Sequence, residues 1–150
     1  MSPLNLDRFS QELVEILPLM FREFSKREDN ELTRGKISFP QMVALDYVSR
    51  CGRVKMTDLA RVLSIKTSSA TVLVDRLIRG KMLSRKRDAK DRRLVWVGCT
   101  EKGKNVVSHI MDQKRQSMKK IFGPLTESER RQYLSVIRKV RDTLLKEHGK

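Results

Sequence analysis

The stretch that most constrains the fold of this chain is residues 64–100, where a helical pattern is followed by a glycine and then by two short strand patterns. The apolar residues of the helical part recur three and four positions apart and mark one face of a helix: Ala70, Leu73, Val74, Leu77 and Ile78. We expect Gly80 to end this helix in a conformation with positive φ. The opposite face of the helix is therefore free to meet a partner.

A hairpin is predicted directly after this helix. Residues 83–87 and 92–99 form its strands around a turn at residues 88–91, and in the second strand apolar residues alternate with Trp96 and Gly98. This period of two indicates a strand with one buried face. The helix, the glycine and the hairpin occur in the order of a winged helix-turn-helix, in which the hairpin is the wing.

The predicted wing carries both signs of charge at its tip. Asp88 and Asp91 are close enough in sequence to Arg92 or Arg93 to pair with them and hold the shape of the arm. Two cationic strands joined by a basic tip can reach a phosphate backbone or a minor groove. We expect Lys90, Arg92 and Arg93 to enter or flank the minor groove.

The free face of the helix carries small hydroxyl side chains at its beginning and cations further along. Short hydroxyls let a helix approach DNA closely and can bond base edges or phosphates, and exposed N–H groups at a helix start favour an anion. The residues expected near base edges are Thr67, Ser68, Ser69, Thr71 and Val72, and those expected to neutralise phosphates are Lys66, Arg76 and Arg79. The alternative for the Thr and Ser run is that it only caps the helix.

Four short motifs follow one another in this part of the chain: Val74-Asp75-Arg76-Leu77, then Gly80, then Asp88-Ala89-Lys90-Asp91-Arg92-Arg93, and last Cys99-Thr100-Glu101-Lys102-Gly103. In combination they resemble the MarR family of transcriptional regulators, and the match covers nearly the whole chain. The resemblance implies a single MarR-like domain over residues 1–150 that is mainly α with a small β-wing. In it, a winged helix-turn-helix part at residues 38–100 is flanked by dimerisation helices at residues 1–30 and 101–150. The family usually has arginine or another polar group where Val72 stands, which implies fewer direct hydrogen bonds to bases here.

The resemblance also implies a ligand site, because members of the family are commonly released from DNA by small, often aromatic or phenolic ligands. Methionine and aromatic side chains suit apolar ligands. The residues that could line such a crevice are Met20, Phe21, Phe24, Met42 and Tyr47. At helical spacing the same residues are also compatible with an ordinary core.

Capping motifs and strand-like residues bound the remaining predicted elements. Ser38 and Gln41 form a capping box before a helix that Gly52 ends, residues 53–56 form a third strand, and Thr57 is expected to cap a short helix. Further on, Thr100 is expected to cap a long helix that breaks at residues 123–124, and Thr126 with Glu129 forms a second capping box.

The terminal helices carry more apolar surface than one small winged domain can cover. Residues 6–26 have apolar positions three and four apart, and the last helix has a narrow apolar seam of Tyr133, Ile137, Val140 and Leu144. This surplus either packs as an internal bundle or meets a second copy across a two-fold axis. Two recognition helices about 34 Å apart would read an inverted repeat, which favours the homodimer.

The net charge of +15 is concentrated on the winged segment. Residues 50–104 contain 16 Lys and Arg against 5 Asp and Glu, a net charge of +11. Such a basic patch attracts polyanions by counterion release, and the apolar insertion face that membrane binding needs is missing from the pattern. Without a membrane span or a signal-peptide pattern at its start, the chain is expected to be cytoplasmic, with double-stranded DNA as its partner.

No catalytic constellation occurs in the sequence, so an enzyme is not expected, and neither a cofactor nor a metal is expected. The two cysteines leave one alternative open. Cys99 alternates with buried valines and fits a small apolar filler, whereas Cys51 lies near the cations Arg50, Arg53 and Lys55, which lower the pKa of a thiol.

The function predicted from the sequence is sequence-specific binding of double-stranded DNA by a homodimeric transcriptional repressor that reads an inverted repeat. A small apolar or phenolic effector is the further expectation that the resemblance brings. The alternatives are a thiol-based redox-sensing regulator and a general architectural DNA-binding protein with little preference among sequences.

Overall fold

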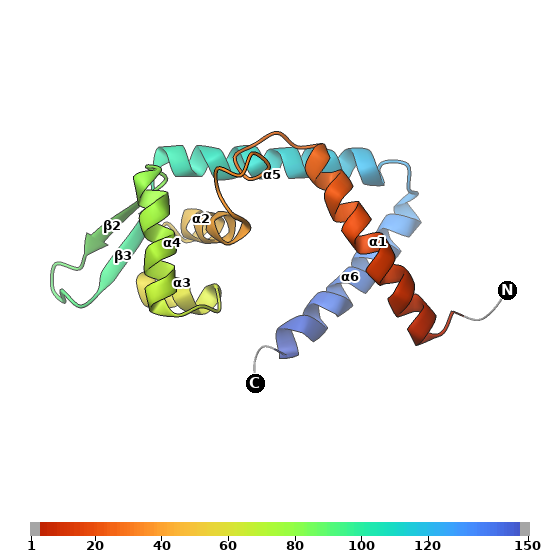
Figure 1. The fold of residues 1–150 in the computed structure, drawn as a ribbon, viewed down its shortest axis with the longest axis horizontal. Helices are drawn as coiled ribbons and strands as arrows, with labels where there is room; N and C mark the ends of the chain where they lie inside the picture. Colours follow the sequence, from red (N-terminus) through yellow and green to blue (C-terminus); the bar gives the residue numbers. More distant parts are fainter. Residues whose placement is uncertain (1–3, 148–150) are drawn as a thin grey trace. The chain divides into compact units, whose positions relative to one another are not determined.

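The computed structural model describes residues 4–147, which contain six helices and one small sheet (Figure 1). Contacts divide the chain into two units, residues 1–114 and 115–150. The elements in chain order are α1 (Leu6–Lys26), α2 (Phe39–Cys51), β1 (Arg53–Lys55), α3 (Met56–Val62), α4 (Thr67–Arg79), β2 (Leu83–Arg87), β3 (Val95–Cys99), α5 (Glu101–Phe122) and α6 (Glu127–Glu147).

The sheet has the antiparallel order β1-β3-β2, so the last strand of the predicted hairpin is central. Val54 pairs with Val97, which pairs in turn with Arg85 on the other side. Because side chains alternate along a strand, this register gives the sheet two distinct faces. Val54 and Val97 are buried against the helices, and Trp96 lies on the opposite face, which we call the outer face of the sheet.

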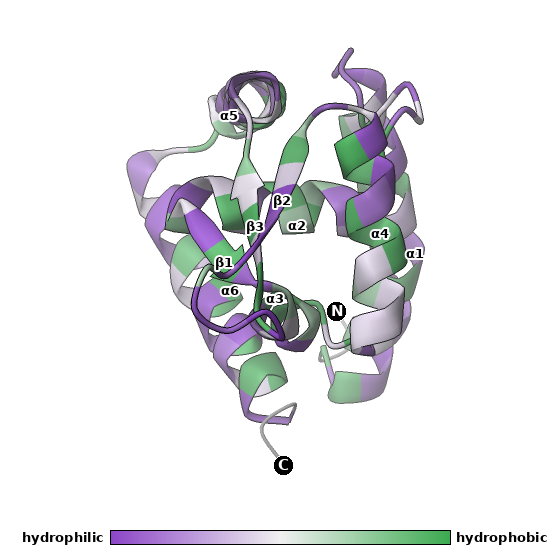
Figure 2. Cartoon of the chain, turned by 90° about the vertical axis from the view of Figure 1, so that its left-hand side faces the viewer, coloured by the Kyte–Doolittle hydropathy of each residue, from purple (hydrophilic) through white to green (hydrophobic). Residues whose placement is uncertain are grey.

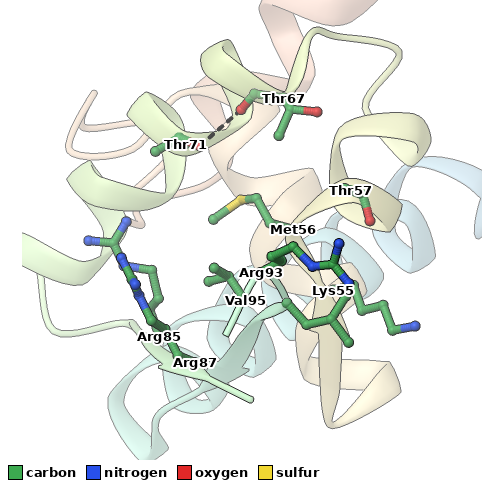
Figure 3. A pocket seen from close by; sticks show the side chains of 10 residues that line it. Lys55, Met56, Thr57, Thr67, Thr71, Arg85, Arg87, Arg93 and Val95 are labelled. Atoms are coloured by element: carbon green, nitrogen blue, oxygen red, sulfur yellow. Dashed lines mark hydrogen bonds between the residues drawn. The ribbon is translucent and has the colours of Figure 1, made fainter. Parts of the chain in front are cut away.

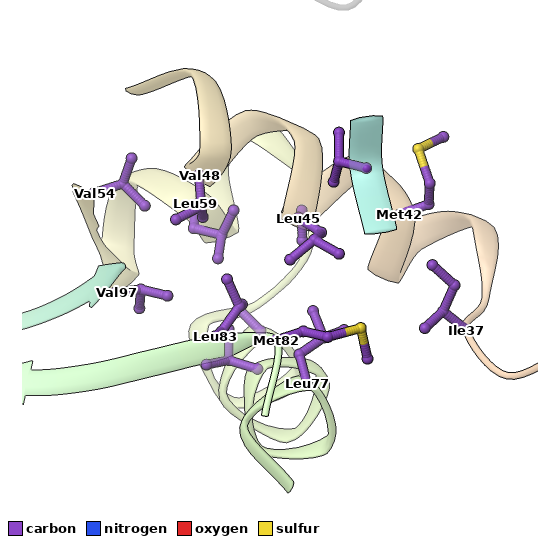
Figure 4. Packing of buried hydrophobic residues seen from close by; sticks show 14 of the residues in the cluster. Ile37, Met42, Leu45, Val48, Val54, Leu59, Leu77, Met82, Leu83 and Val97 are labelled. Carbon is purple, nitrogen blue, oxygen red and sulfur yellow. The ribbon is translucent and has the colours of Figure 1, made fainter. Parts of the chain in front are cut away.

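One hydrophobic core joins the elements around the sheet (Figure 4). Its largest fully buried apolar side chains come from five different elements and are Leu45, Leu59, Leu77, Leu83 and Ile110. Fully burying a leucine or isoleucine side chain stabilises a fold by roughly 1.5–3 kcal/mol. The core thereby fixes α4, which carries most of the predicted DNA contacts, against β2, the first strand of the wing.

The helix predicted from residue 67 is confirmed, but the conformation at its end differs from the one expected. Gly80 has φ −73°, so the expectation of positive φ at this position was wrong, and the left-handed residue is Lys81 with φ 60°. The N–H of Lys81 bonds to the carbonyl of Ile78 and the N–H of Met82 to that of Leu77, a pattern that ends helices with one left-handed residue. A Cβ on Gly80 would come closer than 3 Å only to Cε of Met82, at 2.8 Å, and this is the end of a flexible side chain that can move aside.

Both predicted capping boxes are present. The backbone N–H of Ser38 bonds to the Gln41 side chain at 2.7 Å and the Gln41 N–H bonds back to Ser38 Oγ at 3.3 Å. Thr126 and Glu129 make the same reciprocal pair before α6. The cap assigned to Thr57 was wrong, because α3 already begins at Met56 and Lys55 is its N-cap residue, without a side-chain hydrogen bond.

The two terminal helices bury none of their residues. On α1 the exposed apolar side chains include Leu6 and Phe21, at 76% and 68% exposure, and on α6 they include Val140 at 51%. The apolar surplus read from the sequence is therefore real on both helices. None of the helices within residues 4–147 is long and apolar enough to cross a membrane.

Candidate nucleic-acid interface

The start of α4 has no side-chain cap. Its N-cap residue is Lys66, and the side chain of Lys66 makes no capping hydrogen bond. The hydroxyl of Thr71 donates to the backbone carbonyl of Thr67 at 3.0 Å, so it does not bind the helix-start N–H groups (Figure 3). The alternative that the Thr and Ser run serves only as a cap is therefore weakened, and the first N–H groups of α4 remain available to an anion.

A cationic hollow of about 500 Å³ lies between α4, the beginning of α3 and the strands of the wing (Figure 3). We call it the inner hollow. Its polar lining consists of four cations and three hydroxyls: Lys55, Arg85, Arg87, Arg93, Thr57, Thr67 and Thr71. Like-charged groups gathered around a concave surface focus a positive potential, which favours a polyanion such as a phosphate backbone.

Three of the predicted DNA contacts line this hollow, namely Thr67, Thr71 and Arg93. The others on α4 are exposed on its surface, and Val72 is 54% exposed. Lys90 and Arg92 are exposed at the turn and lie outside the inner hollow. The structure thus brings part of the predicted set together and leaves the remainder along one exposed helix and at the end of the wing.

Sequence reasoning missed two arginines of the inner hollow. Arg85 and Arg87 follow the buried Leu83 at intervals of two, which places all three on the same face of β2. This alternation was the available signal. Arg85 also forms an ion pair with Asp75, with Nη1 and Oδ1 2.8 Å apart, and so links the wing to the middle of α4.

The strands of the wing are shorter than predicted on the return side. β3 begins at Val95, so Arg92 and Arg93 belong to the connecting loop, and we call residues 88–94 the wing tip. In Figure 2 this loop is purple, the colour of hydrophilic residues. Asp91 pairs with Arg93 as predicted, because Oδ1 of Asp91 accepts from both the backbone N–H and Nε of Arg93, at 3.0 and 3.2 Å.

Asp88 has a different role from the one predicted, which was pairing with an arginine of the tip. Its Oδ1 accepts from the backbone N–H groups of Lys90 and Asp91 at 2.9 and 3.0 Å, and its Oδ2 accepts from the indole of Trp96 at 2.9 Å. One carboxylate thus shapes the turn and ties it to the central strand. These hydrogen bonds hold the pKa of Asp88 at about 2, with the Asp91 N–H first among them.

Trp96, which sequence reasoning left unexplained, is the centre of the outer face of the sheet. The guanidinium carbon of Arg53 lies 4.3 Å from the centroid of its rings, and Nζ of Lys55 lies 5.6 Å from it. Cations over an indole face are attracted by its ring quadrupole. Trp96 therefore contacts two cations of the edge strand β1, Arg53 and Lys55. The same indole also anchors the wing tip through its hydrogen bond to Asp88.

The residues predicted to line a ligand crevice occupy different environments. Met42 is buried in the hydrophobic core and Tyr47 packs against that core. Burial, together with the neighbouring Cys51 thiol, raises the pKa of the Tyr47 phenol. Phe21 is exposed on α1, and Met20 and Phe24 are half-buried there.

The two cysteines also differ from each other. Burial raises the pKa of the Cys99 thiol, which favours its neutral form and agrees with the role of an apolar filler beside the core. Cys51 is exposed at the end of α2. A thiol-based mechanism would therefore have to act through Cys51.

Residues 27–110, more than half of the chain, match the family model described as Transcriptional regulator SarA/Rot. A relative from Bacillus subtilis (strain 168), named Uncharacterized HTH-type transcriptional regulator YpoP, is 27% identical over 118 residues. The aligned part covers 79% of this chain and 83% of YpoP.

Two solved structures share the fold. A MarR family protein from Bacillus stearothermophilus has a TM-score of 0.75 and 23% identity, and the alignment covers 95% of this chain and 99% of that one. Streptococcus pneumoniae FabT, in a crystal structure with DNA, has a TM-score of 0.79 and 19% identity, with the same coverage of 95% and 99%. These matches confirm the predicted fold class, which is mainly helical with a small antiparallel wing.

Proposed function

The chain belongs to the SarA/Rot family of transcriptional regulators, and from that premise we propose that it binds double-stranded DNA at specific sequences as a homodimer. Membership in this family confirms two predictions from the sequence, a MarR-type winged-helix regulator and a protein that is not an enzyme. Binding to a specific DNA sequence, assembly into a homodimer and repression of transcription are the parts that we propose.

The inner hollow is the observation that carries the proposal. It combines four cations with the hydroxyls of an uncapped helix start, within one concave surface of about 500 Å³. Phosphate binding needs the cations, and reading a sequence needs a helix that can approach base edges. A purely electrostatic binder needs only the first of these features, so the hydroxyl-bearing surface of α4 favours a specific regulator.

We assign the contacts by position. In the proposed complex α4 lies in the major groove, with base-edge contacts from Thr67, Ser68, Ser69, Thr71 and Val72 and phosphate contacts from Lys66, Arg76 and Arg79. The wing tip places Lys90, Arg92 and Arg93 at the adjacent minor groove, where groove width and potential are read. Asp88 and Asp91 keep the tip in shape through the hydrogen bonds described above.

The homodimer is proposed because both terminal helices leave their apolar residues exposed. Tyr133, Ile137 and Val140 are 41%, 44% and 51% exposed along the seam of α6, and α1 has no buried residue. Apolar stripes of this kind are stabilised when a second helix covers them. We propose that residues 1–30 and 101–150 form the dimerisation part and residues 38–100 the DNA-binding part.

A two-fold pair of such chains would read an inverted repeat and occlude the DNA between its half-sites, which is the basis for proposing a repressor. Release by a small apolar or phenolic effector is the corresponding proposal for regulation. Met20, Phe21, Phe24, Met42 and Tyr47 remain its candidate lining, with the core position of Met42 as the observation that weighs against an open pocket there.

Selection of bound duplexes from a random pool tests the proposal directly. The purified protein should enrich an inverted repeat at physiological salt, and the Ser68→Glu/Ser69→Glu variant should lose the enrichment, because two negative charges would face the bases. A general architectural protein would bind the pool without enriching any sequence. Repeating the selection with oxidised Cys51→Ala protein separates a thiol-based regulator, whose oxidant response would disappear in that variant.

A further inference from the structure

The outer face of the wing sheet also carries several cations. Lys55 and Lys86 both pair with Trp96 from opposite sides, so the three side chains lie on one face, and Arg53 joins them two residues before Lys55. A second hollow, of about 320 Å³, opens on this face, and its lining includes Arg53, Lys86 and Trp96. The wing therefore presents positive charge on both of its faces.

Arg53 is held in place for binding an anion. Its guanidinium stacks 4.3 Å from the Trp96 ring centroid, and the Trp96 indole is itself fixed by its hydrogen bond to Asp88. A stacked guanidinium keeps the N–H groups at its edge free to donate within its plane. An arginine that is already ordered loses less conformational entropy when it binds a phosphate.

The shape of DNA gives this second face a partner. A minor groove is about 6 Å wide and has a phosphate strand along each side. A wing that enters the groove with its tip therefore has one strand beside its inner face and the other strand beside its outer face. Arg85 and Arg93 line only the inner hollow and would face the first of these strands, so the second strand needs cations from the outer face.

We propose that the outer face of the wing, through Arg53 and Lys86 and with Trp96 as a positioning residue, binds the phosphates of the second strand of the minor groove. This inference rests on the proposed DNA-binding function and extends it to a contact on both strands. Charge complementarity and continuity support it, since Arg87 lines both hollows, and Lys55 lines the inner hollow while its Nζ lies 5.6 Å from the Trp96 ring centroid. This face also carries the carboxylate of Asp88, which accepts three hydrogen bonds from neutral N–H groups, keeps its negative charge and is attracted to Arg53.

The salt dependence of binding tests the proposal. Each phosphate contact contributes about 0.9 to the slope of log K against log salt concentration for duplex DNA. We expect R53Q/K86Q to lower the magnitude of the slope by about 2 for each engaged wing, on a random duplex as well as on a selected one. The matched control is R138Q/K139Q, which removes the same charge from exposed positions on α6 and should keep the wild-type slope.

Neutral methylphosphonate linkages then identify the strand. Placed singly along both strands of the minor-groove segment of the selected duplex, they should weaken wild-type binding on both strands. With R53Q/K86Q, they should weaken binding only on the strand beside the inner face. With R93Q, they should weaken binding only on the strand beside the outer face. Trp96→Phe, which keeps a ring under Arg53 but loses the N–H donor to Asp88, should give an intermediate slope.

An R53Q/K86Q slope equal to that of the wild type would overturn the proposal, as would an equal loss of sensitivity on both strands. An acidic protein partner on this face would also leave the slope unchanged. Failure of the proposed function has a different signature, because the wild type would then bind the selected and random duplexes equally well. The slope on the random duplex still tests the outer face in that case.

Discussion

The indole Nε1 of Trp96 donates to Oδ2 of Asp88 over 2.9 Å, which joins the central strand of the wing to its tip. The other oxygen of the same carboxylate accepts from two backbone N–H groups of the turn. The position of the tip relative to the sheet therefore depends on one ionised side chain. Its consequence for stability can be measured by changing the pH.

Acid should weaken the wing. The folded-state pKa of Asp88, about 2, is below the ordinary value of 3.8, so the carboxylate stabilises the fold fully above about pH 4. This contribution is lost as the pH falls through 2, because protonation removes acceptor capacity. Asp88→Asn should be less stable than the wild type at pH 5, and the difference should shrink toward pH 2. Urea unfolding across this pH range is the measurement, and a difference independent of pH would contradict the role of Asp88.

Arg92 is, with Lys90, one of the exposed cations of the tip that lie outside the inner hollow. Arg92→Ala should weaken DNA binding by about 1 to 3 kcal/mol while leaving the circular dichroism spectrum and melting temperature unchanged. Titration of a fluorescent duplex at fixed salt measures the loss. An unaltered affinity would mean that the tip does not contact DNA.

Gly103 supports the start of α5 by its lack of a side chain. A Cβ there would lie 2.1 Å from the carbonyl oxygen of Met82 and 2.8 Å from Sγ of Cys99, and the first of these atoms is backbone. Gly103→Ala should therefore destabilise the fold by about 3 kcal/mol. Gly98→Ala is the control, because its Cβ would lie no closer than 3.3 Å to the Ser84 hydroxyl and 3.9 Å to the Gly52 carbonyl oxygen. Equal unfolding free energies for the two variants would show that the backbone at Gly103 does not pack closely against the Met82 carbonyl.

The seam of α6 should hold two chains together. Val140→Asp places a charge in the middle of the seam, where Val140 is 51% exposed in the single chain. The variant should sediment with the mass of one 17.5 kDa chain at concentrations where the wild type is a dimer. Ser135→Asp, an exposed position away from the seam, should leave the mass unchanged. Equal masses for the wild type and Val140→Asp would remove α6 from the interface.

Local chemistry was enough to predict most helix starts and the presence of the three strands. In each capping box, the two partners exchange hydrogen bonds within a single turn: Ser38 with Gln41, and Thr126 with Glu129. Four consecutive residues of sequence therefore contain the whole signal for the helix start. The alternation of apolar residues in β3 likewise needs only its own five positions.

Features that depend on packing were not predictable in this way. Gly80 keeps a helical φ and the left-handed conformation falls on Lys81, where the N–H of Met82 closes the turn onto the carbonyl of Leu77. The partner of Asp88 is Trp96 rather than an arginine nearer in sequence, because the hairpin brings position 96 back to the turn. The inner hollow is built from α3, α4 and the wing, and only the fold places Lys55 beside Arg85 and Thr67.

The central claim is that a two-fold pair of chains sets two copies of α4 about one helical turn of DNA apart. Inserting five base pairs between the half-sites of the selected duplex tests it most directly, because the insertion turns one half-site to the opposite side of the helix. The account predicts that affinity for the lengthened duplex falls to that of a duplex with one half-site. Undiminished affinity for the lengthened duplex would contradict it.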